Sequence, residues 1–217
     1  MFGHRWVLAM AIPSIVLATG CKSVETPFPQ GLEPLEENRA ELPAPEGSEP
    51  RPERLEAVSG ETDDFWWTHA RGYVHADISQ TWQALQEIPV NVDRREVDEW
   101  TWDLIEPPAY DHEYVIHNTV FDIITVQFDV TWRHGLVVGT SDVPEVVGIR
   151  FQKTFGSDVI ELLEGSIVLL AAQEDTEIQL IEHVHAFSGS PQTTESYLRD
   201  LFQDAVDQVH GRPLQTF

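Results

Sequence analysis

Two histidines near the end of the chain, His183 and His185, have the spacing of paired metal ligands on a β-strand. Residues two apart on a strand share a face, so their imidazole rings would lie side by side. A zinc site needs a further ligand, which Glu161 or His117 would supply from a neighbouring strand. The same spacing is also typical of the solvent-facing side of a strand whose other face is apolar. We favour this second interpretation and predict no metal and no cofactor.

Nucleophilic catalysis has no clear candidate in the sequence. The chain has one cysteine, Cys21. The serines of Ser188-Gly189-Ser190 lack the strand–turn–helix context of a hydrolase nucleophile and indicate a turn before Pro191. Gly-rich phosphate-binding loops are absent from the sequence. The 37 acidic residues are too many to choose a general acid–base pair from spacing alone. We therefore assign no catalytic residues.

Cys21 is the residue with the clearest predicted chemistry. It follows a basic Arg5, an apolar stretch over residues 6–16 and a small-residue run that ends at Gly20. That order is typical of a secretion signal, so residues 1–20 are predicted to be a signal peptide. Residues 17–21, Leu-Ala-Thr-Gly-Cys, resemble a bacterial lipobox. The resemblance implies that the cysteine is lipidated after cleavage, and that the protein is anchored in the bacterial cell envelope.

Two alternatives to the lipobox are a plain secretory signal and a transmembrane anchor. The apolar stretch is shorter than the roughly 20 residues that a spanning helix needs, and Pro13 interrupts it. In the family that the lipobox defines, Lys22 in place of an aspartate implies the outer membrane. We therefore expect attachment through lipid on Cys21, with the protein facing the periplasm.

Charge limits the partners of this protein. The formal net charge is −24, with 13 basic and 37 acidic residues. Such a chain is repelled by nucleic acid and by anionic lipid headgroups, so no nucleic-acid partner is expected. With one cysteine, an internal disulfide cannot form, and stability must come from a packed core.

Residues 21–62 have the composition of a disordered tether. They are rich in glutamate and poor in large apolar residues, and they contain seven of the chain's 14 prolines: Pro27, Pro29, Pro34, Pro43, Pro45, Pro50 and Pro52. Such a segment buries too little surface to offset the entropy of ordering it. The sequence thus predicts three parts: signal peptide 1–20, acidic tether 21–62 and one globular domain 63–217.

The globular domain has an α+β pattern. Period-two alternation over 124–133, with Phe128 and Trp132 on one face, predicts a half-buried antiparallel strand that ends in a turn at His134-Gly135. A helical stripe including Leu198, Leu201 and Phe202 predicts a C-terminal helix capped by Thr193 or Thr194. The other expected elements are strands over 65–77, 146–155, 160–172 and 177–187, and short helices over 80–88 and 92–100.

This order resembles the helix-grip fold of the START-like, or polyketide cyclase and SRPBCC, superfamily. The segments 74–85 and 174–180 carry the resemblance: a strand, a turn and a helix with tryptophan and leucine, and later the hairpin before the last helix. It implies a curved antiparallel sheet around a long C-terminal helix, with two short helices after the first strand and a cavity between sheet and helix. Many members bind lipids or other apolar molecules, and some are cyclases or hydratases.

Aromatic residues are the best candidates for lining such a cavity, although aromatic residues also fill ordinary cores. The candidate lining residues are Trp82, Phe128, Trp132, Phe151, Phe155 and Phe202. We expect a non-enzymatic lipoprotein whose domain binds a lipid or another apolar small molecule. Two alternatives remain open: a protein-interaction module with a filled core, and an enzyme of the cyclase or hydratase type. The oligomeric state is not predicted.

Overall fold

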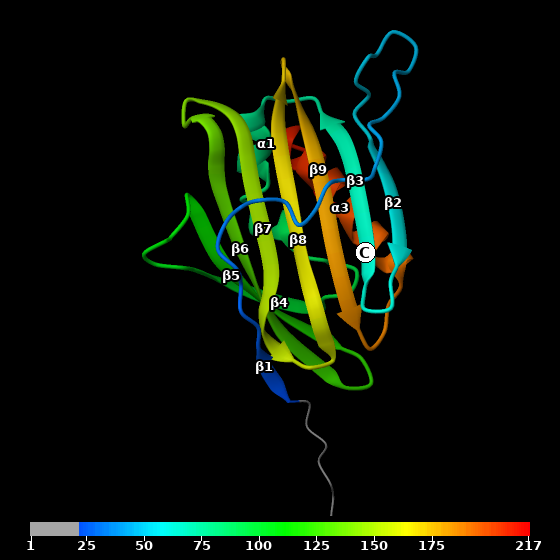
Figure 1. Ribbon diagram of the computed structural model, residues 1–217, viewed down its shortest axis with the longest axis vertical. Helices are drawn as coiled ribbons and strands as arrows, with labels where there is room; N and C mark the ends of the chain where they lie inside the picture. The colour runs from blue at the N-terminus through cyan, green and yellow to red at the C-terminus, as the bar shows by residue number, and fades with distance from the viewer. Residues whose placement is uncertain (1–21) are drawn as a thin grey trace, which may run out of the picture.

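The alternating segments of the sequence form one antiparallel sheet that curves around the last helix (Figure 1). The structure is a computed structural model and describes residues 22–217, so the expected signal peptide and Cys21 lie outside the described residues. The strands are β1 Ser23–Glu25, β2 Leu55–Glu61, β3 Trp66–Val74, β4 Glu99–Leu104, β5 His112–Phe121, β6 Thr125–Thr140, β7 Val143–Ser157, β8 Ile160–Ala172 and β9 Asp175–Ala186. The helices are α1 Ile78–Ala84, α2 Ile88–Asn91 and α3 Pro191–Val209.

The sheet order is β2-β3-β9-β8-β7-β6-β5-β4, with β1 paired to the end of β7. Each strand pair is antiparallel, and the long hairpins β6–β7 and β8–β9 form the centre. Helix α3 packs on the inner face against β2, β3 and β9. Its predicted apolar stripe is buried: Leu198 and Leu201 are 1% exposed. The expected helix-grip fold class is confirmed.

Several local boundaries differ from those predicted. Asp77, and not Ser79, caps α1, because its side chain accepts the Gln80 N–H. The helix expected over 92–100 is replaced by α2, which starts with Pro at its first turn. Ser190 caps α3, with Pro191 as the first helical residue. Proline lacks an N–H and favours that position, which moves the helix start upstream of Thr193.

The expected disordered tether over residues 21–62 is corrected by the structure. Strand β1 pairs with β7, the chain that follows crosses the outer face of the sheet and then forms a loop that projects beyond one end of it, and β2 forms the edge of the sheet against β3 (Figure 1). The Leu35 N–H donates to Ser166 Oγ at 3.1 Å, and Asn38 Nδ2 donates to the carbonyls of Ala70 and Leu180 at 3.0 and 3.1 Å. The prolines prevent a regular ladder but leave polar groups that bond to the sheet. The prediction of disorder from composition was therefore wrong for this segment.

Two glycines explain how the segment lies so close to the sheet. Gly135 and Gly148 are partners across β6 and β7. A Cβ on Gly135 would meet Leu32 Cδ1 at 2.5 Å, and one on Gly148 would meet the Leu32 carbonyl oxygen at 2.9 Å. Gly135 is therefore a packing position inside β6, and the turn expected at His134-Gly135 is wrong.

Candidate functional site

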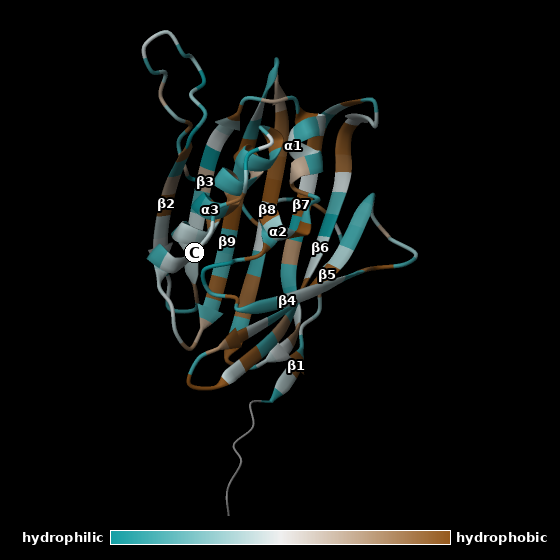
Figure 2. Cartoon of the chain, turned by 180° about the vertical axis from the view of Figure 1, so that it is seen from behind, coloured by the Kyte–Doolittle hydropathy of each residue, from teal (hydrophilic) through white to brown (hydrophobic). Residues whose placement is uncertain are grey.

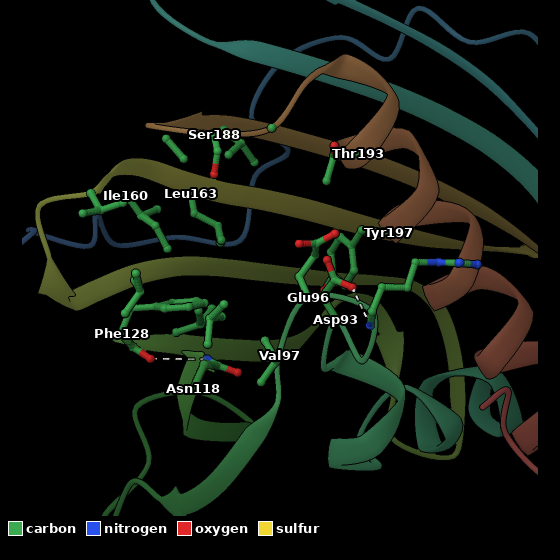
Figure 3. A pocket seen from close by; sticks show the side chains of 18 of the residues that line it. Asp93, Glu96, Val97, Asn118, Phe128, Ile160, Leu163, Ser188, Thr193 and Tyr197 are labelled. Carbon is green, nitrogen blue, oxygen red and sulfur yellow. Dashed lines mark hydrogen bonds between the residues drawn. The ribbon is translucent and has the colours of Figure 1, made fainter. Parts of the chain in front are cut away.

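A cavity of about 910 Å³ lies between the inner face of the sheet, the start of α3 and the chain that joins α2 to β4. Its apolar wall comes from strands β5 to β9, whose inward side chains alternate with outward ones. Figure 3 shows Phe128, Ile160 and Leu163 on one side of the space and Thr193 and Tyr197 of α3 on another. The inner-wall side chains include Ile116, Val126, Phe128, Val130, Trp132, Phe151, Leu163 and Val184.

Three stacked aromatic rings lie at one wall of the cavity, and two of them, Trp132 and Phe151, belong to its lining. The rings of Trp132 and Phe151 stack with centroids 4.4 Å apart, and Tyr114 stacks on the other side of Trp132 at 6.1 Å. Gly165 makes room for this stack, because a Cβ there would lie 1.9 Å from Phe151 Cζ. All three rings are at most 1% exposed, so the stack is closely packed and gives this wall a mainly apolar surface.

A buried carboxyl group interrupts the apolar wall. Glu182 of β9 lines the cavity and is only 3% exposed. It lies opposite Thr68 on β3 and Gly165 on β8. No residue within 22–217 donates a hydrogen bond to its carboxyl or forms an ion pair with it. Burial, together with the nearby charge of Asp93, raises the pKa of Glu182 well above its usual value. Burial therefore favours the protonated form of this carboxyl, which can donate a hydrogen bond, more than it does in an exposed glutamate.

Asp93 belongs to the same polar end of the cavity. Its carboxylate accepts the Arg95 N–H at 3.1 Å. Burial, opposed by backbone hydrogen bonds and reinforced by neighbouring acids, raises the pKa of Asp93 to about 6. The Tyr197 hydroxyl, which donates to the Asn91 carbonyl at 3.0 Å, lines the cavity beside it. Figure 3 shows Asp93, Glu96 and Tyr197 together at this end.

The electrostatic balance of the lining is strongly acidic. Its acidic side chains are Asp93, Glu96, Asp98, Asp122 and Glu182, and Arg95 is the one basic side chain among the described lining residues. The Arg95 guanidinium is already paired with Asp200, with 3.0 Å between Nη2 and Oδ1. An anionic head group would therefore meet carboxyl groups and no free cation.

The six predicted lining residues divide evenly. Phe128, Trp132 and Phe151 line the cavity. Trp82 and Phe202 instead pack in the core around α1 and α3. Phe155 is 43% exposed near the end of β7, where it pairs with Glu25 of β1. The spacing of aromatic residues did not distinguish these environments, because a ring packs equally well into a core or beside a cavity.

The polar end of the cavity was not predicted. Glu182 has the same strand parity as Leu180 and Val184, so it is an acid on an otherwise apolar face. That break in alternation was the available signal. Asp93 gave no such signal, because it lies in a connecting segment without periodicity.

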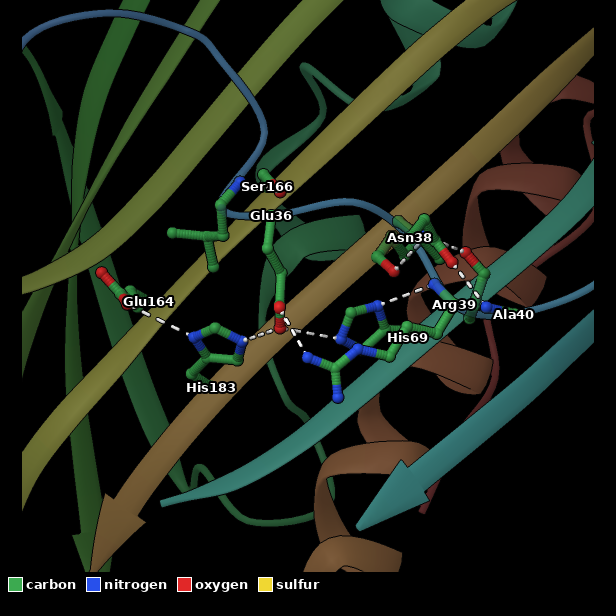
Figure 4. A network of polar contacts seen from close by, with 11 residues as sticks. Glu36, Asn38, Arg39, Ala40, His69, Glu164, Ser166 and His183 are labelled. Atoms are coloured by element: carbon green, nitrogen blue, oxygen red, sulfur yellow. Dashed lines mark hydrogen bonds and ion pairs between the residues drawn. The ribbon is translucent and has the colours of Figure 1, made fainter. Parts of the chain in front are cut away.

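A second cluster lies on the outer face, where residues 26–54 cross the sheet (Figure 4). Glu36 Oε1 lies 3.0 Å from His69 Nε2 and 3.1 Å from His183 Nε2, and Glu36 Oε2 pairs with Arg39. Burial acts to raise the pKa of Glu36, but the hydrogen bond from His183 and the positive neighbours lower it overall. Glu36 is therefore a charged acceptor held by three donors.

The tautomers of these histidines fit a hydrogen-bond clamp better than a metal site. The Arg39 N–H donates to His69 Nδ1 at 3.1 Å, so the proton of this buried ring is on Nε2 and points at Glu36. A metal at Nε2 would require that nitrogen to be unprotonated. His183 faces a carboxylate on each side, Glu36 and Glu164, the latter at 3.4 Å from Nδ1. Both histidines thus act as donors to carboxylates.

The metal ligands considered from sequence are not gathered in one place. His183 points to Glu36 and Glu164, whereas His185 lies 3.6 Å from Glu161. His117 is held by Asp129 and Asp103 on strands β4 to β6. The metal alternative for His183 and His185 therefore divides into separate contacts, and the favoured solvent-facing position is wrong for His183, which is 7% exposed.

No family model matches the sequence, and no curated protein matches it. Among solved structures, human StAR-related lipid transfer protein 5 has a TM-score of 0.49 at 9% identity, covering 74% of this chain and 84% of that chain. The lipid transfer and protein localization domain of human StarD13 gives 0.47 at 10%, with coverages of 76% and 86%. The Zhui aromatase/cyclase from Streptomyces sp. R1128 gives 0.42 at 10%, with coverages of 73% and 93%. We therefore base the function on the cavity itself.

Proposed function

We propose that this protein is a membrane-anchored lipoprotein of the bacterial cell envelope whose domain binds an amphipathic small molecule. The observation that carries the proposal is the cavity of about 910 Å³. It falls within the range of ligand sites, about 300–1,000 Å³, and it is lined mainly by apolar side chains. A protein-interaction module with a filled core has no need of such a space, so the cavity favours a ligand.

The chemistry of the wall defines the ligand further. The stacked rings of Trp132 and Phe151 suit an apolar body, whose burial is favoured by the hydrophobic effect. At the polar end, the raised pKa of Glu182 favours its protonated form, which suits a neutral oxygen acceptor such as a carbonyl or hydroxyl group. A fatty-acid carboxylate is disfavoured, because the acidic side chains of the lining repel it. The expected ligand is therefore a neutral lipid-like molecule and not a free fatty acid.

Membrane attachment is proposed through lipid on Cys21. Two or more acyl chains hold a protein stably at a membrane, whereas one is marginal. Among residues 22–217, no helix is long and apolar enough to cross a bilayer. Metabolic acyl labelling of the wild type and of Cys21→Ser tests the lipid anchor. Absence of label in the wild type, or equal labelling of the variant, would reject it.

Ligand binding is tested by native mass spectrometry of the full chain after mild extraction, with displacement of a fluorescent neutral acyl probe. Leu163→Trp adds bulk inside the cavity and should abolish binding of the probe. Leu104→Trp, on the exposed face of β4, is the matched control and should leave binding unchanged. A wild type without co-purifying molecule or probe binding would overturn the proposal.

Glu182 and Asp93 also favour a second candidate, acid–base chemistry of the cyclase or hydratase type. Both carboxyl groups line the cavity, and both have raised pKa values. Enzymes use such shifted groups to donate and accept protons near neutral pH. Conversion of a bound neutral lipid by the wild type but not by Glu182→Gln, seen as a mass change, would favour this candidate. An unchanged ligand in both proteins would favour binding alone.

A further inference from the structure

One end of the sheet gathers the mouth of the cavity and the first described residue. The antiparallel registers bring together at this end the last residues of β2, β5, β7 and β9. The first residues of β3, β6, β8 and α3 lie at the same end. Strand β1 is held at the same end, and the Asp158 N–H donates to the Lys22 carbonyl at 3.0 Å. Figure 1 shows this end at the bottom, where the chain enters β1.

The same end carries large apolar side chains in contact with solvent. Ile123 at the tip of the β5–β6 hairpin is 96% exposed, and Phe187 after β9 is 91% exposed. Phe121 and Ile124 flank Ile123, and all four line the mouth of the cavity. Figure 2 shows hydrophobic segments in the hairpin loop at this lower end. We call Phe121, Ile123, Ile124 and Phe187 the apolar rim.

We propose that the apolar rim docks on a lipid bilayer of neutral headgroup charge, so that the mouth of the cavity faces the membrane. The rim is continuous with the cavity, and Cys21, which would be the first residue after the expected cleavage, joins the described chain at this end. Bulky apolar side chains on loop tips are stabilised at a membrane interface because burial removes their surface from water. This goes beyond the proposed function, because it fixes the orientation of the domain and needs no particular ligand.

The folded N-terminal segment supports this orientation. A long disordered tether would let the domain adopt any orientation, at a distance from the membrane. Instead, Ser23 is already paired with Ser157 in the sheet. A lipid on Cys21 would therefore lie within two residues of the rim's end of the molecule. An anchor in that position brings Ile123 and Phe187 to the bilayer surface.

Charge selects the type of membrane. Asp122 lies inside the rim, and Asp63, Asp64 and Asp158 lie in the neighbouring turns. These carboxylates are repelled by anionic lipids, so a zwitterionic surface such as phosphatidylcholine is the expected partner. A second copy of the chain is the other occupant that an apolar rim would fit, and the experiment below separates the two.

The test uses the mature chain, residues 21–217, with Cys21→Ser, which removes the one native thiol and leaves out the apolar signal peptide. A single cysteine is introduced as Ile123→Cys or Phe187→Cys and labelled with an environment-sensitive fluorophore. The matched control is Val143→Cys, an exposed position at the opposite end of β7. Each protein is mixed with phosphatidylcholine vesicles that contain or lack nitroxide-labelled phosphatidylcholine. Fluorescence is measured only on the protein that floats with the vesicles.

We expect nitroxide quenching at 123 and 187 to be several-fold greater than at 143, and to decrease when phosphatidylglycerol is added. Because Cys21 is absent, this result does not depend on lipidation, and ligand binding is measured separately with the neutral probe. Equal quenching at all three positions, or protein that does not float, would overturn the proposal. If the fluorescence emission of the label at 123 shifts to the blue without nitroxide quenching, a second copy of the chain covers the rim. That result would also overturn the proposal.

Discussion

The two faces of the sheet each hold a glutamate, partly buried on the outer face and fully buried on the inner face, and the surroundings of the two carboxyl groups are opposite. On the outer face, Glu36 receives donors from His69, His183 and Arg39. On the inner face, Glu182 has no protein partner among the described residues and faces a cavity. A satisfied buried charge fixes structure, whereas an unsatisfied polar group in a cavity costs free energy that a ligand recovers. The partners of a carboxyl group, more than its burial, therefore separate structural from binding sites.

The largest expected effect contrasts the packed and hollow parts of the inner face. Leu201→Ala should cost about 2–5 kcal/mol of unfolding free energy, because Leu201 is 1% exposed in the core under α3. Leu163→Ala, at the cavity wall, should cost less than about 1.5 kcal/mol, since little packing surrounds it. Urea unfolding of both variants measures the difference. Equal costs would mean that the cavity is closed in solution.

Asp93 provides the next effect, with a defined pH dependence. Its pKa is raised from 3.8 to about 6 in the folded protein, so the unfolded carboxyl ionises first as pH rises. The wild type should therefore lose up to about 3 kcal/mol between pH 4 and pH 6, at 1.36 kcal/mol per pKa unit. Asp93→Asn removes this loss and should be the more stable protein at pH 7. Urea midpoints at pH 4 and pH 7 test it, and an unchanged difference between the proteins would contradict it.

Loss of the hydrogen bonds that His69, His183 and Arg39 make to Glu36 should have a smaller effect on stability. Glu36→Gln removes the charged acceptor of His69 and Arg39 and should cost about 1–3 kcal/mol. The lowered pKa of Glu36 makes its contribution present above about pH 4.5 and lost as pH falls further. Hydrogen exchange should show faster opening of residues 33–40, with the core strands unaffected. Glu33→Gln, which lacks these partners, is the control and should leave the exchange unchanged.

The sequence predicted the fold because its strongest signals are periodic. Phe128 and Trp132 alternate with polar residues, and Leu198 and Leu201 recur at helical spacing, so the sheet and α3 were recognised. The course of residues 26–54 was not recognised, because it depends on Leu32 meeting Gly135 and Gly148, which lie in a hairpin much later in the chain. Phe128, Trp132 and Phe151 lie in the cavity lining, but the polar end of the cavity depends on how Glu182 and Asp93 meet across different elements. Tertiary contacts of this kind leave little local pattern.

The smallest expected effect on stability is at the centre of the cavity. Burial raises the pKa of Glu182 well above its usual value in the folded protein. The carboxyl of the unfolded chain therefore ionises at lower pH, so Glu182 itself lowers the stability at pH 7 and Glu182→Gln should not destabilise the fold. Glutamine keeps the shape and a hydrogen-bond donor, so binding of a neutral acyl probe should persist.

Glu182→Leu keeps the burial but removes the donor. It should weaken probe binding about tenfold, as loss of a buried hydrogen bond of about 1.4 kcal/mol would do. Calorimetric titration of the three proteins measures this order. If Glu182→Leu binds the probe as tightly as the wild type, Glu182 does not contact the ligand, and the contrast between the two faces of the sheet loses its functional meaning.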